Sequence, residues 1–128
     1  MKITFYKVRL KKRFPLAISR GVRSDSENLF IRYEKEGITG WGEAAPGKSE
    51  GAESVIKVKQ ALEKFISTGI NNFSIQELYD RSRELKIPPC AYVGLDTALW
   101  DWQAKKEGLP LYKPVSYTHL TLPTILLV

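Results

Sequence analysis

Two arginines, Arg20 and Arg23, stand three residues apart in a stretch rich in serine and glycine, "ISRGVRSDSEN". A guanidinium group can form two parallel hydrogen bonds to one carboxylate, so a pair of arginines in such a stretch is suited to binding an anionic ligand. Exposed arginines of a basic protein are the alternative interpretation. The stretch taken alone is equally compatible with both.

Glu43 is the carboxylate whose position most suggests a site. It lies near the end of an expected strand, "ITGWGEA", and precedes a loop, where side chains often face a ligand. The alternative, which we favour, is that Glu43 is a structural acceptor for backbone amides or for a nearby arginine.

The other candidate groups point away from catalysis. Asp96 and Asp101 are five residues apart on an expected helix and project about 140° from each other, so they do not form a metal pair. We expect them to be helix-surface groups or hydrogen-bond partners between elements. His119 is the sole histidine, and no nucleophile or orienting carboxylate flanks it. The glycines of "GITGWG" lack the following helix and the Gly-Lys-Ser/Thr of a phosphate loop, so they predict a tight turn and close backbone packing.

Composition is that of a single ordinary globular domain. The chain has 128 residues, is 43% hydrophobic and carries a net charge of +6. Cys90 is the only cysteine, which excludes an internal disulfide and a cysteine-rich zinc site. No signal peptide and no apolar run of membrane-spanning length is recognisable, so we expect a cytoplasmic protein without a membrane partner.

The basic residues near the N-terminus raise the possibility of a nucleic-acid partner. Lys7, Arg9, Lys11 and Arg13 would share one face of a strand. No nucleic-acid motif accompanies them. They therefore predict a solvated strand face or an edge strand protected by charge, and we expect no nucleic acid to bind.

The spacing of apolar residues, which predicts the elements that position these groups, changes half-way along the chain. Alternating patterns predict strands over residues 2–10, 29–34 and 38–44, with a long loop over 14–28. Helical periodicity then predicts helices over about 52–67, from Ser74 to Leu85, and over about 91–107, the last ended by Gly108. Strands followed by helices indicate an α+β fold, in which a three-stranded antiparallel meander precedes a three-helix bundle.

Two tryptophans lie on the third expected helix. Trp102 shares the apolar stripe of Leu95 and Leu99 and should anchor the helix on the sheet, whereas Trp100 lies about 160° away. We expect Trp100 to face a missing part of the protein.

The segments "KKRFPLAISRGVRSDSENLFIRYEKEGITGWGEAAP" and "AYVGLDTALWDWQAKKEGLPLYK" together resemble the N-terminal capping domain of the enolase superfamily. Within it they resemble the muconate-lactonizing branch, and among its members the dipeptide epimerases, of the L-Ala-D/L-Glu epimerase type. The resemblance covers residues 1–113. It implies an isomerase whose (β/α) barrel supplies the acid/base lysines and the carboxylates that hold Mg²⁺. It also implies a full-length enzyme that is a homo-oligomer.

The resemblance assigns substrate selection to two loops of the cap, at about residues 18–25 and 46–53. Arg23 falls where some dipeptide epimerases bind the acidic side chain of a dipeptide with an arginine. By the same matching we expect Arg20, Ser19 and Lys48 to contact the substrate, a dipeptide or another carboxylate. No catalytic residue and no metal ligand is expected within this chain.

The last fifteen residues, "PVSYTHLTLPTILLV", depart from the family pattern. They carry no Lys, Arg, Asp or Glu and lack the glycine turn with which the family continues. The string is similar to translated adapter or vector sequence, so we expect residues 114–128 to be non-native and to replace the barrel. A genuine first barrel strand is the alternative.

Two classes of function follow. One is the cap of a dipeptide epimerase, inactive without its barrel; caps of a cycloisomerase or an o-succinylbenzoate synthase would have similar strands and helices. The other is a free-standing anion-binding module that uses Arg20 and Arg23.

Overall fold

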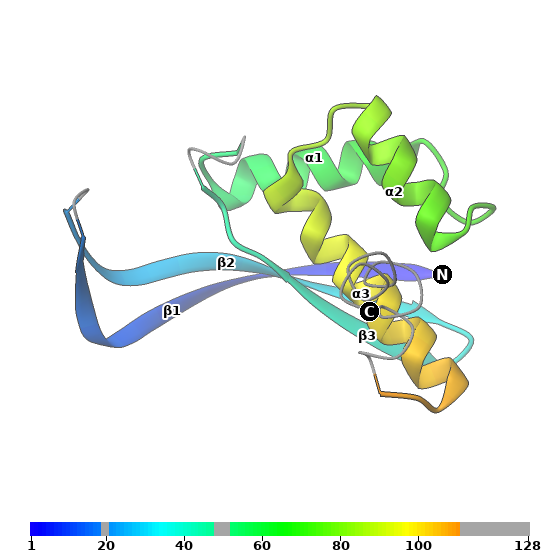
Figure 1. The fold of residues 1–128 in the computed structure, drawn as a ribbon, viewed down its shortest axis with the longest axis horizontal. Coiled ribbons are helices and arrows are strands. Elements are labelled where there is room, and N and C mark those ends of the chain that lie inside the picture. The colour runs from blue at the N-terminus through cyan, green and yellow to red at the C-terminus, as the bar shows by residue number, and fades with distance from the viewer. Residues whose placement is uncertain (19–20, 48–51, 111–128) are drawn as a thin grey trace, which may run out of the picture.

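The fold is a three-stranded meander followed by three helices, as the sequence predicted (Figure 1). The structure, a computed structural model, describes residues 1–18, 21–47 and 52–110, and for 11–18 and 21–25 it describes the backbone alone. The elements in chain order are β1 (Lys2–Ile18), β2 (Gly21–Lys35), β3 (Ile38–Ala44), α1 (Val55–Ser67), α2 (Ile75–Glu84) and α3 (Pro89–Glu107).

The sheet has the order β1-β2-β3, and both neighbouring pairs are antiparallel. The β2–β3 ladder extends from Leu29 opposite Ala44 to Lys35 opposite Ile38. Glu36 and Gly37 form the two-residue turn with φ of 55° and 74°. Tight hairpins require positive φ at both central residues, and glycine supplies it at the second without strain.

The expected loop over residues 14–28 is wrong, because most of it is strand. β1 continues to Ile18 and pairs with Gly21, so the two strands form a long ribbon that extends well beyond β3. The register shifts between Lys11 and Leu16, a stretch that contains Pro15; proline within sheets is confined to edges and such irregularities. The stretch contains Pro15 and is rich in serine, glycine and arginine, and these residue types predict a loop as long as the pairing of distant residues is unknown.

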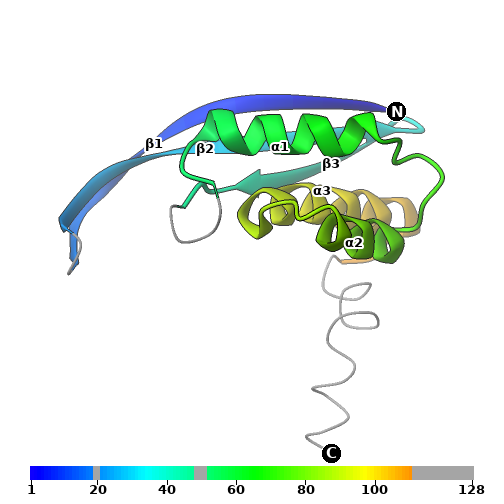
Figure 2. The same ribbon diagram turned by 90° about the horizontal axis from the view of Figure 1, so that it is seen from above.

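The three helices cover only the end of the sheet nearest the N-terminus (Figure 2). α3 packs on β3 and β2, and α1 packs on β2. The apolar side chains of these helices form one core with the inner face of β2, as the helical periodicity predicted. The largest fully buried side chains of that core are Leu29, Ile31, Val58, Leu62, Phe65 and Leu95.

The glycines of "GITGWG" let a strand and a helix touch backbone to backbone. A Cβ built on Gly42 would overlap the carbonyl oxygen of Gly94 on α3, and one on Gly40 would overlap that of Ala98. Gly94 is equally confined, since its added Cβ would lie 2.6 Å from Cδ1 of Ile31. The predicted tight turn and close backbone packing are confirmed.

The helix ends follow the expected chemistry. The hydroxyl of Ser74 accepts a hydrogen bond from the backbone N–H of Glu77 at 3.1 Å and so begins α2. Gly108 ends α3 in the left-handed conformation, with φ of 68°. α1 begins at Val55, three residues later than expected, because Ser54 is its N-cap.

Both tryptophans of α3 are buried, which corrects part of the expectation. Trp102 is the predicted anchor: it is 6% exposed, its Nε1 donates to the carbonyl oxygen of Lys35 at 2.8 Å, and its ring meets Tyr33 edge-on at 5.9 Å between centroids. Trp100 is also only 7% exposed, although it lies outside the main core cluster. Exposure therefore does not distinguish the two residues.

Candidate functional site at the end of the sheet

The four residues predicted to bind substrate lie at the edge of what the structure describes. Arg23 is in β2, where its backbone is opposite Leu16; its side chain is outside the described part of the chain. Ser19, Arg20 and Lys48 fall outside the described residues altogether. The expectation that Arg23 sits in a loop is wrong, because Gly21 begins a strand.

The backbone brings the two expected selecting segments out of the sheet at the same end. The free end of the β1–β2 ribbon and the carboxyl end of β3 point the same way in both views (Figures 1 and 2). From Asn28 back to Gly21, β2 spans seven residue steps, or about 23 Å at the usual rise per residue. After β3, the N–H of Gly47 donates to the carbonyl oxygen of Ala52 at 2.8 Å and closes the second segment at its base.

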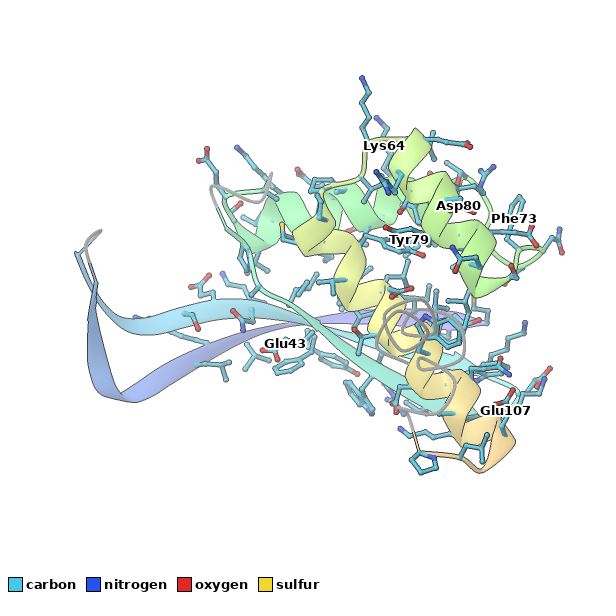
Figure 3. All side chains as sticks on the ribbon, viewed as in Figure 1. Glu43, Lys64, Phe73, Tyr79, Asp80 and Glu107 are labelled. Carbon is cyan, nitrogen blue, oxygen red and sulfur yellow. The ribbon has the colours of Figure 1, made fainter. Side chains whose placement is uncertain are left out.

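Glu43 lies where the ribbon leaves the sheet (Figure 3), and it accepts a hydrogen bond from Nδ2 of Asn28 at 2.6 Å. Its predicted role as a structural acceptor is confirmed, with one difference: the donor is a side-chain amide, not a backbone amide or an arginine. Sequence reasoning missed Asn28. The signal for it is register: once Leu29 is opposite Ala44, Asn28 and Glu43 are diagonal neighbours on one face of the sheet and within reach of each other.

Asp101 joins elements, as predicted. Its Oδ2 accepts from the backbone N–H of Trp41 at 2.9 Å and from Nζ of Lys105 at 2.8 Å. Lys105 also donates to the carbonyl oxygen of Thr39 at 2.9 Å. The aspartate and the lysine thus tie α3 to β3.

Lys7 and Arg9 are exposed on one face of β1, as expected of a solvated strand face. β1 is an edge strand of the sheet, and Nζ of Lys7 lies 3.4 Å from Oε2 of Glu27. On the opposite face of the same end, Tyr6 and Trp41 are 39% and 44% exposed, and their rings stand 5.9 Å apart. Arg32 lies over the Trp41 ring at 5.7 Å.

A hollow of about 590 Å³ lies at the other end of the molecule, between the beginning of α2 and the second half of α3. Its walls combine aromatic, aliphatic and polar side chains, and the ammonium groups of Lys35 and Lys106 lie beside the Trp102 ring. Phe73 and Glu107, both labelled in Figure 3, mark two of its sides. The hollow is remote from the ribbon and contains none of the predicted site residues.

Two tyrosines of the described part of the chain, Tyr33 and Tyr92, have a shifted pKa. Burial, helped by Glu36, raises the pKa of Tyr33. Burial, helped by Asp96, Asp80 and Tyr79, also raises the pKa of Tyr92. Both hydroxyls stay protonated at neutral pH, so neither offers a phenolate as a base. Their contribution to stability is complete below the ordinary tyrosine pKa of about 10 and is lost as the pH rises above it.

The described residues do not fit a magnesium site. Within residues 1–18, 21–47 and 52–110, no three carboxylate, histidine or cysteine side chains gather closely enough to hold a metal ion. In the same part of the chain, no helix combines the length and apolar character needed to cross a bilayer.

Comparison with known proteins gives this arrangement a context. Residues 1–115 match the model of the mandelate racemase / muconate lactonizing enzyme N-terminal domain. A hydrophobic dipeptide epimerase of Flavobacteria bacterium (strain MS024-2A) is 68% identical over 124 residues, which are 97% of this chain and 36% of that protein. A hydrophobic dipeptide epimerase of Roseobacter litoralis is 48% identical over 112 residues, 88% of this chain and 32% of that protein.

Solved structures share the fold. The crystal structure of the dipeptide epimerase from Enterococcus faecalis V583, complexed with Mg and the dipeptide L-Leu-L-Tyr, has a TM-score of 0.77 at 24% identity over 88% of this chain and 33% of that one. This chain therefore spans about a third of the length of the relatives it matches. With a family match over nearly its whole length, the chain belongs to the mandelate racemase / muconate lactonizing enzyme family of the enolase superfamily, as an N-terminal domain of that family.

Proposed function

We propose that this chain is the substrate-selecting cap of a Mg²⁺-dependent dipeptide epimerase. Such an isomerase removes the proton next to a carboxylate and returns it to the opposite face. The observation that carries the proposal is the 68% identity to a hydrophobic dipeptide epimerase over 97% of this chain. Its relatives at 30–31% identity include further dipeptide epimerases, so the reaction class is common to the group.

The division of labour follows from what the chain contains. Its relatives are about three times longer, so the acid/base groups and Mg²⁺ ligands of the enzyme would belong to the remaining two-thirds. The Enterococcus relative crystallised with Mg supports the metal for the group. The described residues supply instead a rigid base, from which two segments leave at one end of the sheet and could reach a substrate.

For the substrate we propose a hydrophobic dipeptide, because the relatives at 68% and 48% identity both carry that name. An acidic dipeptide is the second candidate. It is supported by Arg23, which the family resemblance places where some dipeptide epimerases use an arginine, and by a 31% identical L-Ala-D/L-Glu epimerase of Bacteroides thetaiotaomicron. An arginine that forms two hydrogen bonds to a carboxylate would select such a side chain by geometry as well as charge.

The test joins residues 1–113 to the barrel of the Flavobacteria relative in place of that protein's own cap. Epimerisation is measured in D₂O by mass spectrometry, as incorporation of one deuterium at the carbon next to the carboxylate. We expect the chimera to exchange hydrophobic dipeptides at a rate within about tenfold of the parent enzyme.

Two controls accompany the chimera. The barrel without any cap measures how much activity the cap supplies, and the 128-residue chain alone should incorporate no deuterium. A chimera that folds but exchanges no dipeptide of either class would contradict the proposal. A clear preference for acidic dipeptides would select the second candidate.

A further inference from the structure

We propose that Glu43 is a positioning residue that, through Asn28, fixes the two substrate-selecting segments relative to each other. The consequence for catalysis rests on the proposed function. The coupling itself, the link that the Glu43–Asn28 bond makes between the end of β3 and the ribbon, is a property of the fold. It gives a role to a carboxylate whose placement the sequence marked as unusual.

The contact stands at a junction in the sheet. Leu29 opposite Ala44 is the last backbone pair of β2 and β3, and beyond it β2 continues only in the ribbon with β1. Glu43 and Asn28 flank that last pair and close it with a side-chain bond of 2.6 Å from Nδ2 to Oε2. A hydrogen bond to an ionised carboxylate is shorter and about twice as strong as a neutral one.

The two partners differ in burial, and this difference indicates which of them is ordered by the hydrogen bond. Asn28 is only 9% exposed, so its amide is held in place by its surroundings, whereas Glu43 is exposed and needs a partner to be ordered. A long exposed side chain fixed by one strong bond restrains the backbone that carries it. The restrained backbone is the end of β3.

Each partner lies at the base of one segment. The ribbon extends from Asn28 toward Gly21, and the chain after Glu43 reaches Gly47 in four residues. Gly47 then bonds to Ala52 and closes the second segment. The Glu43–Asn28 bond therefore links the end of β3 to the start of the free ribbon, so its loss should loosen these two described bases while the seven β2–β3 backbone pairs remain.

The first experiment uses the 128-residue chain itself and needs no enzyme activity. Amide hydrogen exchange is measured by NMR for Gly47, whose N–H donates to Ala52, and for residues 22–27 of the ribbon. We expect Glu43→Ala to speed exchange at both places by about tenfold or more, because local opening becomes easier without the bond. Glu43→Gln retains an acceptor oxygen for Asn28 and should stay within about threefold of the unaltered protein.

Glu34→Ala is the matched control. Glu34 is a carboxylate on the same outer face of the sheet, paired with Arg32 at 3.3 Å, but it lies at the opposite end of β2 from the ribbon. Its removal changes the net charge equally and should leave the exchange of Gly47 and of residues 22–27 unchanged. Faster exchange in Glu34→Ala equal to that in Glu43→Ala would overturn the coupling.

The second experiment uses the chimera with the Flavobacteria barrel. Glu43→Ala should raise KM for the dipeptide about tenfold while kcat stays within about twofold, and Glu43→Gln should restore KM. Faster exchange with unchanged KM would overturn the positioning role, and unchanged exchange would overturn the coupling. An inactive chimera with unaltered sequence would instead count against the proposed function, while the exchange data would still decide the coupling.

Discussion

The two ends of the sheet are built on different principles. At the N-terminal end three strands lie under three helices, and β3 approaches α3 so closely that only glycine fits at two positions. At the other end β1 and β2 continue as a two-stranded ribbon, a structure that is at best marginally stable alone. Stability is therefore concentrated where helices cover the sheet. We infer that residues of the uncovered end can be substituted at little cost to folding.

The largest expected effect lies in the covered end. Trp102→Ala removes a buried indole, its hydrogen bond to the Lys35 carbonyl and its edge contact with Tyr33. We expect a loss of about 3–5 kcal/mol in the free energy of unfolding, measured by denaturant titration. Val93→Ala, on the exposed side of the same helix, is the control and should change stability by less than about 1 kcal/mol. Equal losses in both variants would show that Trp102 is not the anchor.

Gly42→Ala tests the close approach of strand and helix. The added methyl group would meet backbone atoms of Gly94 and Ala98, which can move only if α3 shifts as a whole. We expect destabilisation of about 3 kcal/mol, at the upper end for overpacking. Gly37→Ala has open space around it and should lose only the roughly 1–2 kcal/mol of left-handed strain. A thermal scan in which Gly37→Ala is the less stable variant would contradict this packing argument.

In the uncovered end we expect an effect on substrate choice instead of stability. In the chimera, Arg23→Met should lower kcat/KM about ten- to hundredfold for dipeptides with Glu or Asp in the second position, and hardly at all for hydrophobic ones. Such a fall corresponds to about 1.5–3 kcal/mol, the size of a charge-assisted hydrogen bond. Arg23→Lys should not rescue it, because an ammonium group cannot form the two parallel bonds.

Arg32→Met is the matched control for Arg23, since Arg32 lies on the same strand but within the three-stranded part of the sheet. It should leave the ratio of the two kcat/KM values unchanged. An equal loss on acidic and hydrophobic dipeptides in Arg23→Met would assign Arg23 to the folding of the ribbon.

The smallest effect is expected from residues 114–128. We propose that they are foreign to the family domain, so truncation after Lys113 should leave the melting temperature unchanged and improve solubility. The family match ends at residue 115, whereas the Flavobacteria match covers 97% of this chain and extends into the segment, which favours the alternative of a natural continuation. A loss of more than about 2 kcal/mol, the value of one well-buried large side chain, would show that the segment belongs to the fold.

Local chemistry was determined by the sequence alone. The hydroxyl of Ser74 caps α2 and Gly108 ends α3 because these signals act within one turn of chain. The buried stripe of α1 follows from the 3.6-residue period for the same reason. The family could be recognised from the two motifs around the glycines and the third helix, and the match over residues 1–115 confirms it.

Only the tertiary structure decided the features that join distant residues. The ribbon was taken for a loop because Pro15 and the serines and glycine of this stretch are local loop signals, whereas the strand pairing joins distant residues. The burial of Trp100 was missed because helical angles give direction without showing what lies there. Asn28 and Glu43 are fifteen residues apart, and only the β2–β3 register brings an amide to a carboxylate at the base of both segments.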